Sequence, residues 1–227
     1  MNRYLIVLAV FLVIYFIFYL WKKKKSNDIV EELYQVMLKN DEAKLNEICE
    51  SRLTKFLFSP YHLYYYKLNF YTKNDHEKKA EELLRKLLPL KIRDKEKLSF
   101  LNLVFPYFLG KENRKVCEEI VPTIKRLSQK DPNSQQINEE LDLLMDIYIH
   151  PNRARIAELE GKIAEAEGEA KAMLLERLAT LYMMLDEIGK AKEMFDQAVP
   201  LAENAVYRAK LELLAEKTGE KVNKKSK

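Results

Sequence analysis

Glycine is scarce in this chain: five occur among 227 residues, and all of them lie beyond residue 109. No stretch alternates apolar and polar residues for long enough to indicate a half-buried strand. Leucine, lysine, glutamate and alanine, which favour helices, are abundant. These features exclude a β-rich fold and predict a chain built from helices.

The motifs that usually carry chemistry are also absent. Neither the GxxxxGK[ST] pattern nor the GxGxxG pattern of phosphate-binding loops occurs. The three histidines, His62, His76 and His150, have no HExxH or CxxC motif beside them. Neighbouring acids such as Glu81 and Glu82 point about 100° apart on a helix, which is typical of a solvated face. We therefore expect no catalytic residues, no metal, no cofactor and no enzymatic activity.

Cysteine is limited to Cys49 and Cys117, which are far apart in the sequence. Both lie among apolar neighbours on helical patterns. Free Cys is among the most buried residue types and is common in reducing compartments. We predict two buried free thiols rather than a disulfide or a nucleophile.

Charge is missing from residues 4–21, which read YLIVLAVFLVIYFIFYLW before a run of four lysines. Eighteen helical residues cover about 27 Å, close to the roughly 30 Å of a bilayer core. A cleaved secretory signal is the alternative, but no small-residue cleavage site follows. The pattern predicts an N-terminal transmembrane helix over 4–21. Its predicted membrane-interface residues are Trp21, Lys22, Lys23, Lys24 and Lys25.

The flanking charges predict an orientation. The α-amino group and Arg3 precede the apolar run, whereas four lysines follow it. The positive-inside rule then places residues 22–227 in the cytoplasm of a single-pass cell-membrane protein. Residues 22–25 are expected to meet anionic headgroups.

The body of the chain does not share the positive charge of its ends. The formal charge is +4, yet residues 28–219 contain 30 basic and 34 acidic side chains. Such a body is not suited to a phosphate backbone, so we expect no nucleic-acid partner. The polar, basic segment 220–227 is predicted to be a disordered tail.

Turn and capping residues divide the rest of the chain. Asn40-Asp41, Asp131-Pro132 and His150-Pro151 are typical breaks between helices. No long loop separates the apolar-periodic runs. The sequence predicts eleven helices after a basic linker at 22–27, over 28–39, 41–58, 60–73, 75–90, 94–109, 112–129, 134–149, 152–167, 169–186, 188–202 and 204–218.

A repeated spacing of small and large residues is the second strong signal. The best unit contains Leu175, Leu178, Ala179, Tyr182, Ala191, Phe195 and Ala198. Weaker copies of its second half start at Ala80, Cys117 and Ala157. The successive offsets from Ala80 through these residues to Ala191 are 37, 40 and 34 residues.

These residues resemble the tetratricopeptide repeat, although Leu175 stands where the family favours Trp and Ala179 where it favours Gly. The resemblance implies an all-α fold in which antiparallel helix pairs stack into an α-solenoid. We expect about five pairs over 28–219, with 204–218 as a capping helix behind the last pair. The transmembrane helix would precede this domain, with residues 1–3 on the other side of the membrane.

Aromatic residues crowd the segment 56–71. One interpretation is that Tyr64, Leu68 and Tyr71 pack inside the repeat. The other is that some of the segment lines a partner-binding groove. The resemblance implies that groove residues come from the first helix of each pair. The groove candidates are His62, Tyr65, Asn69, Met173, Glu176, Thr180 and Met183.

These expectations combine into one functional hypothesis. A membrane-tethered adaptor or scaffold would bind a membrane-associated protein partner at the cytoplasmic face, while 4–21 meets the bilayer. One alternative is a structural membrane protein that assembles with copies of itself. Another is an enzyme whose site uses no recognised motif.

Overall fold

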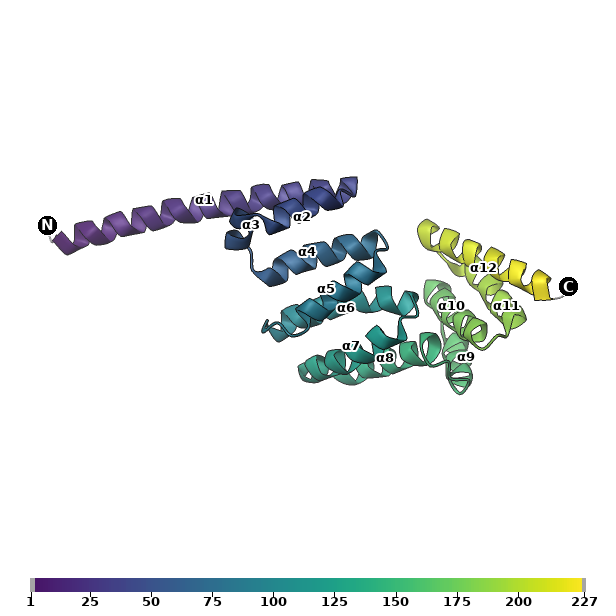
Figure 1. The fold of residues 1–227 in the computed structure, drawn as a ribbon. Coiled ribbons are helices and arrows are strands. Elements are labelled where there is room, and N and C mark those ends of the chain that lie inside the picture. Colours follow the sequence, from purple (N-terminus) through teal and green to yellow (C-terminus); the bar gives the residue numbers. More distant parts are fainter. Residues whose placement is uncertain (1–2, 226–227) are drawn as a thin grey trace. The chain divides into compact units, whose positions relative to one another are not determined.

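The computed structural model describes the backbone of residues 3–225 and the side chains of residues 7–223. Every regular element in this part of the chain is helical, so the prediction of an all-α protein is confirmed. Two 3₁₀ turns, Ser128–Lys130 and Val199–Leu201, accompany the α-helices (Figure 1). The helices are α1 (Arg3–Lys39), α2 (Glu42–Glu50), α3 (Arg52–Leu57), α4 (Pro60–Lys73), α5 (Glu77–Leu87), α6 (Asp94–Gly110), α7 (Arg114–Leu127), α8 (Ser134–Tyr148), α9 (Arg155–Glu165), α10 (Gly168–Met184), α11 (Ile188–Ala198) and α12 (Ala205–Lys225).

The chain forms two compact units, and the repeat domain expected over 28–219 stays a prediction. Unit 1 is residues 1–100, which hold α1 to α5 and the beginning of α6. Unit 2 is residues 101–227, which hold the rest of α6 and α7 to α12.

Helix α1 is one continuous element of 37 residues. The expected linker at 22–27 is helical, because lysine is a good helix former and does not interrupt the ladder. The second half of α1 buries Ile29, Leu33 and Val36, which lie on one face at helical spacing, and packs against α2. The first half projects beyond α2 and α3 (Figure 1).

The structure corrects the prediction of an N-terminal transmembrane helix. Among the residues it describes, no helix has both the length and the apolarity that a membrane crossing requires. The predicted outer end at 1–3 lies almost wholly outside the described residues. The cell-membrane location and the cytoplasmic orientation stay predictions.

Local capping explains how unit 1 is divided. The expected helix 41–58 is two helices, because Ser51 ends α2 and caps α3 by accepting a hydrogen bond from the backbone N–H of Thr54 at 3.1 Å. Asp41 caps α2 in the same way through the N–H of Lys44 at 2.9 Å. Helices α4 and α5 then pair, with Leu68 and Leu84 buried.

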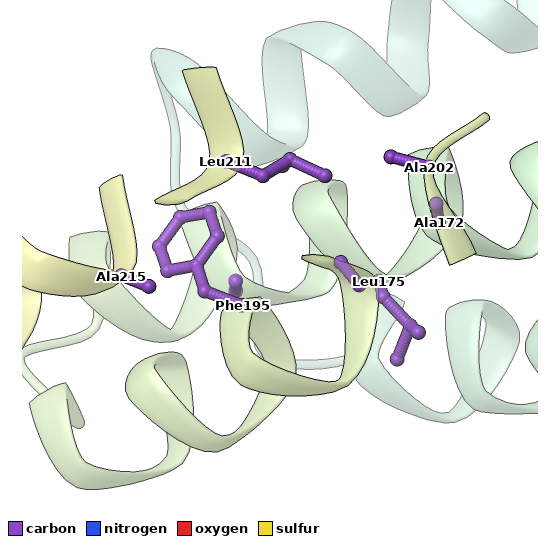
Figure 2. Close-up of a cluster of buried hydrophobic side chains, with 8 residues drawn as sticks. Ala172, Leu175, Phe195, Ala202, Leu211 and Ala215 are labelled. Atoms are coloured by element: carbon purple, nitrogen blue, oxygen red, sulfur yellow. The ribbon is translucent and has the colours of Figure 1, made fainter. Parts of the chain in front are cut away.

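In unit 2 the residues of the best repeated pattern belong to the core. All seven of its pattern residues are buried, and α10 and α11 lie against each other over most of their length. Helix α12 covers α11, and Figure 2 shows the Phe195 ring next to Leu211 and Ala215 of α12. Helix α12 therefore buries apolar residues against α11, and it continues to Lys225 instead of ending at 218.

The weaker copies of the pattern have mixed outcomes. The copies that start at Ala80 and Cys117 are buried throughout. In α9 the predicted residues Ala157, Gly161 and Ala164 are exposed, and Leu159 is the buried residue. Small residues suit a solvated surface as well as a helix crossing, so the larger apolar residue of α9 determined which face is buried.

Both cysteines are free and buried, as predicted. Burial raises the pKa of the Cys49 thiol and of the Cys117 thiol to about 11. A thiol that stays protonated is a poor nucleophile.

We expect both thiols of the native chain to resist Ellman's reagent at pH 8 and to react at once in denaturant. The reason is that burial both raises their pKa and blocks access. A spectrophotometric time course measures the rate, and the Cys49→Ala and Cys117→Ala variants assign each thiol. Rapid reaction of either thiol without denaturant would contradict this burial.

Replacing Phe195 with alanine should lower the free energy of unfolding by about 3–5 kcal/mol, because the ring is buried between helices and its loss leaves a cavity. Urea unfolding followed by circular dichroism measures the change. Val206→Ala is the matched control, since Val206 is 81% exposed on α12 and should cost little. Equal costs for the two variants would show that the Phe195 cluster does not hold unit 2 together.

Candidate functional site

Unit 2 contains a groove of about 460 Å³ that every second helix helps to line. We call it the unit 2 groove. Its walls come from α6, α8, α10 and α12, with one residue from α11. The lining residues are Phe105, Pro106, Leu109, Gly110, Leu144, Tyr148, Glu176, Thr180, Met183, Phe195, Lys210 and Leu214.

Most of the lining is apolar. Phe105 and Leu109 of α6 are buried, whereas Leu144 of α8 and Met183 of α10 are half-buried and leave part of their surface to the groove. Met183 also receives a weak hydrogen bond on its Sδ atom from the Thr218 hydroxyl at 3.6 Å. A thioether among aliphatic side chains gives the wall an adaptable shape.

One carboxylate organises the polar part of the groove. The Glu176 side chain is only 14% exposed and accepts hydrogen bonds from the Tyr207 hydroxyl at 2.8 Å and the Lys210 ammonium at 2.5 Å. The Lys210 ammonium also lies 5.8 Å from the centre of the Tyr207 ring. Because this acid and this base neutralise each other, the centre of the groove carries no net charge from them.

Two hydroxyl groups lie beside this pair. The Thr180 hydroxyl donates to the backbone carbonyl of Glu176 at 2.9 Å, and Tyr148 lines the groove together with Thr180. Burial, followed by the charge of Glu176, raises the pKa of Tyr148. The pKa of Tyr207 is raised by burial first and then by its hydrogen bond to Glu176. Both phenols therefore stay protonated at neutral pH and act as neutral polar groups.

The structure brings together three of the predicted groove residues of α10. Glu176, Thr180 and Met183 line the unit 2 groove, whereas Met173 is exposed and lies outside the lining. Their role in binding a partner stays a prediction.

The predicted residues of α4 do not line a described cavity. His62 is exposed and its Nδ1 lies 2.8 Å from the Ser59 hydroxyl. The Tyr65 ring lies near those of Tyr61 and Tyr66, with centroid distances of 6.2 and 6.5 Å. Asn69 is half-buried.

Unit 1 has a smaller cavity of about 280 Å³. Its lining residues are Cys49, Glu50, Lys55, Phe58, Pro60, Leu63, Tyr64 and Lys67. Within the aromatic segment, Leu68 and Tyr71 are buried as the core interpretation expects, while Tyr64 lines this cavity.

The lysines of this smaller cavity are engaged. Lys55 and Lys67 donate to the Glu50 carboxylate at 2.5 and 2.8 Å. These two bonds lower the pKa of Glu50 to about 2. The arrangement satisfies its own charges, so we assign no anion-binding role to it.

Sequence reasoning missed the groove residues outside α10, although one signal could have found two of them. Lys210 and Leu214 follow Glu176 and Thr180 by 34 residues, which is the offset between Ala157 and Ala191. Extending that offset from α10 to α12 predicts both positions. Phe105 and Leu144 carry no comparable mark.

The described residues contain no group of three or more His, Cys, Asp or Glu side chains that could hold a metal ion. The Nε2 atom of His150 lies 3.1 Å from the Glu118 carboxylate on the surface.

Comparisons with protein-family models, with curated proteins and with solved structures found no match to this chain. The tetratricopeptide resemblance therefore still depends on the residues that suggested it. What the structure adds is the burial of those residues in α10 and α11.

Replacing Glu176 with glutamine should lower the pKa of Tyr207, because the ionised phenol would no longer be repelled by a neighbouring carboxylate. The value should remain above the ordinary 10, because burial persists. NMR titration of ¹³C-labelled tyrosines measures the shift, with Tyr207→Phe to assign the signal. Glu193→Gln, at an exposed position on α11, should leave it unchanged. An unaltered Tyr207 pKa in Glu176→Gln would disprove the coupling.

Proposed function

We propose that this chain is a non-catalytic adaptor that binds a segment of a protein partner in the unit 2 groove. The observation that carries the proposal is the lining itself. Four alternating helices of one unit each contribute side chains to a single apolar groove around a neutralised polar centre. Stacked helices are known to use such surfaces for extended partners.

The size and chemistry of the groove favour a peptide segment. A volume of about 460 Å³ is enough for several apolar side chains. Leu144, Met183 and Leu214 offer contact surface for such anchors. The Tyr148 hydroxyl lies beside them and can donate to a main-chain carbonyl group, whereas the Thr180 hydroxyl, whose hydrogen is donated to Glu176, can accept from a main-chain N–H group. Apolar anchors with a few fixed polar contacts are the usual basis of peptide recognition.

The charge of the groove indicates which kind of peptide segment it would bind. Lys210 is the only basic residue that lines the described groove, and it already donates to Glu176. A clamp for an acidic tail needs basic groups that are not neutralised by their neighbours. The groove therefore favours a segment whose contacting residues are apolar and uncharged.

Selection of random peptides displayed on phage against the immobilised full chain tests this function. Enriched peptides should carry apolar anchors, and fluorescence anisotropy should show at least about tenfold weaker binding to Leu144→Asp. Leu213→Asp is the matched control, because Leu213 is an exposed leucine outside the lining.

A second groove variant separates blockage from unfolding. Thr180→Trp fills the groove without adding charge, and circular dichroism verifies that each variant keeps its helices. The proposal is overturned if no peptide is enriched, or if enriched peptides bind the folded groove variants as tightly as they bind the original chain.

A further inference from the structure

The first half of α1 is apolar on every side. The described side chains of residues 7–21 are all exposed, from 41% at Trp21 to 68% at Tyr15 among the larger ones. Soluble proteins rarely expose continuous apolar surface on this scale without a binding partner. The unit 2 groove does not account for this segment.

A collar of positive charge follows it directly. Lys22, Lys23 and Lys24 are exposed, and Lys25 is the only one of the four lysines with a described ion pair, to Asp28 at 3.6 Å. The collar lies on the same continuous helix as the apolar segment. Apolar surface is therefore followed within one residue by a cluster of cations.

Aromatic residues mark the boundary between the two. Phe18 stacks on Trp21 with ring centroids 5.7 Å apart and meets Phe56 of α3 edge-on at 6.5 Å. Phe56 is 61% exposed, and Leu53 on the same short helix is also exposed. These side chains extend the apolar surface to α3, next to the lysines. Aromatic rings at the junction of apolar and charged surface suit a lipid–water interface.

We propose that residues 7–21 enter an anionic lipid bilayer from one side while the lysine collar lies among its headgroups. A protein groove or a second copy of the helix would cover one stripe of α1, whereas the exposed apolar surface surrounds it. Lipid chains cover a helix on all sides. Anionic headgroups complement four adjacent lysines, which attract them over a Debye length. The proposal concerns attachment and is independent of partner binding in unit 2.

Vesicle flotation of the full chain, transferred from mild detergent, tests the attachment. Vesicles of phosphatidylcholine alone should carry the chain, and vesicles that also contain phosphatidylserine should bind it more tightly. Salt should weaken only the additional binding that phosphatidylserine provides, because that part is electrostatic. Replacing Lys22, Lys23, Lys24 and Lys25 with glutamine should reduce binding to the anionic vesicles by at least about tenfold.

A matched charge control uses exposed lysines elsewhere. The variant with Lys86, Lys91, Lys95 and Lys217 changed to glutamine alters the net charge equally and should float like the original chain. Phe11→Asp combined with Ile14→Asp should abolish flotation on both kinds of vesicle, because charges in hydrocarbon are costly. Circular dichroism reports whether each variant keeps its helices.

Two results would overturn the proposal. One is a chain that stays at the bottom of the gradient with both kinds of vesicle. The other is a Phe11 and Ile14 variant that floats normally but changes from an oligomer to a monomer in light scattering, because another copy would then cover the segment.

Discussion

The close approach of helices at small side chains determines the structure of unit 2. Ala179 and Ala198 are completely buried, which lets the backbones of α10 and α11 come near enough for Phe195 to fill the space toward α12. That packing fixes the distance from α10 to α12. It therefore also fixes Glu176 within reach of Tyr207 and Lys210, so the polar centre of the groove depends on an apolar contact elsewhere.

How far the sequence predicts this molecule depends on how ambiguous each residue is. Large residues that alternate with small ones defined α10 and α11 correctly, but alanine and glycine in α9 also suit solvent, and their face was predicted wrongly. Four consecutive lysines suggested a linker, yet lysine favours helix, and α1 passes through them. The transmembrane helix was inferred from eighteen residues, and the described side chains of α1 do not support it.

The groove was only partly predictable for a related reason. Residues at a repeated position, such as Thr180 and Leu214, can be inferred from one another by counting along the chain. Phe105 and Leu144 join the lining because of the way α6 and α8 pack in unit 2, and no spacing in the sequence encodes that. The two cavities also differ in the partners of their carboxylates. In unit 1 the Glu50 carboxylate pairs with two lysines, whereas in unit 2 the Glu176 carboxylate lies beside neutral hydroxyl groups and an apolar wall.

The unbroken course of α1 has a mechanical consequence. Thirty-seven residues at about 1.5 Å each make a rod of roughly 55 Å, without a joint between its apolar half and the half that packs on α2. Tilting or rotating the apolar half must turn α2 with it. Inserting a single residue between the two halves would rotate one against the other by about 100°. The helix therefore fixes the rotation of α2 relative to whatever binds the apolar half of α1.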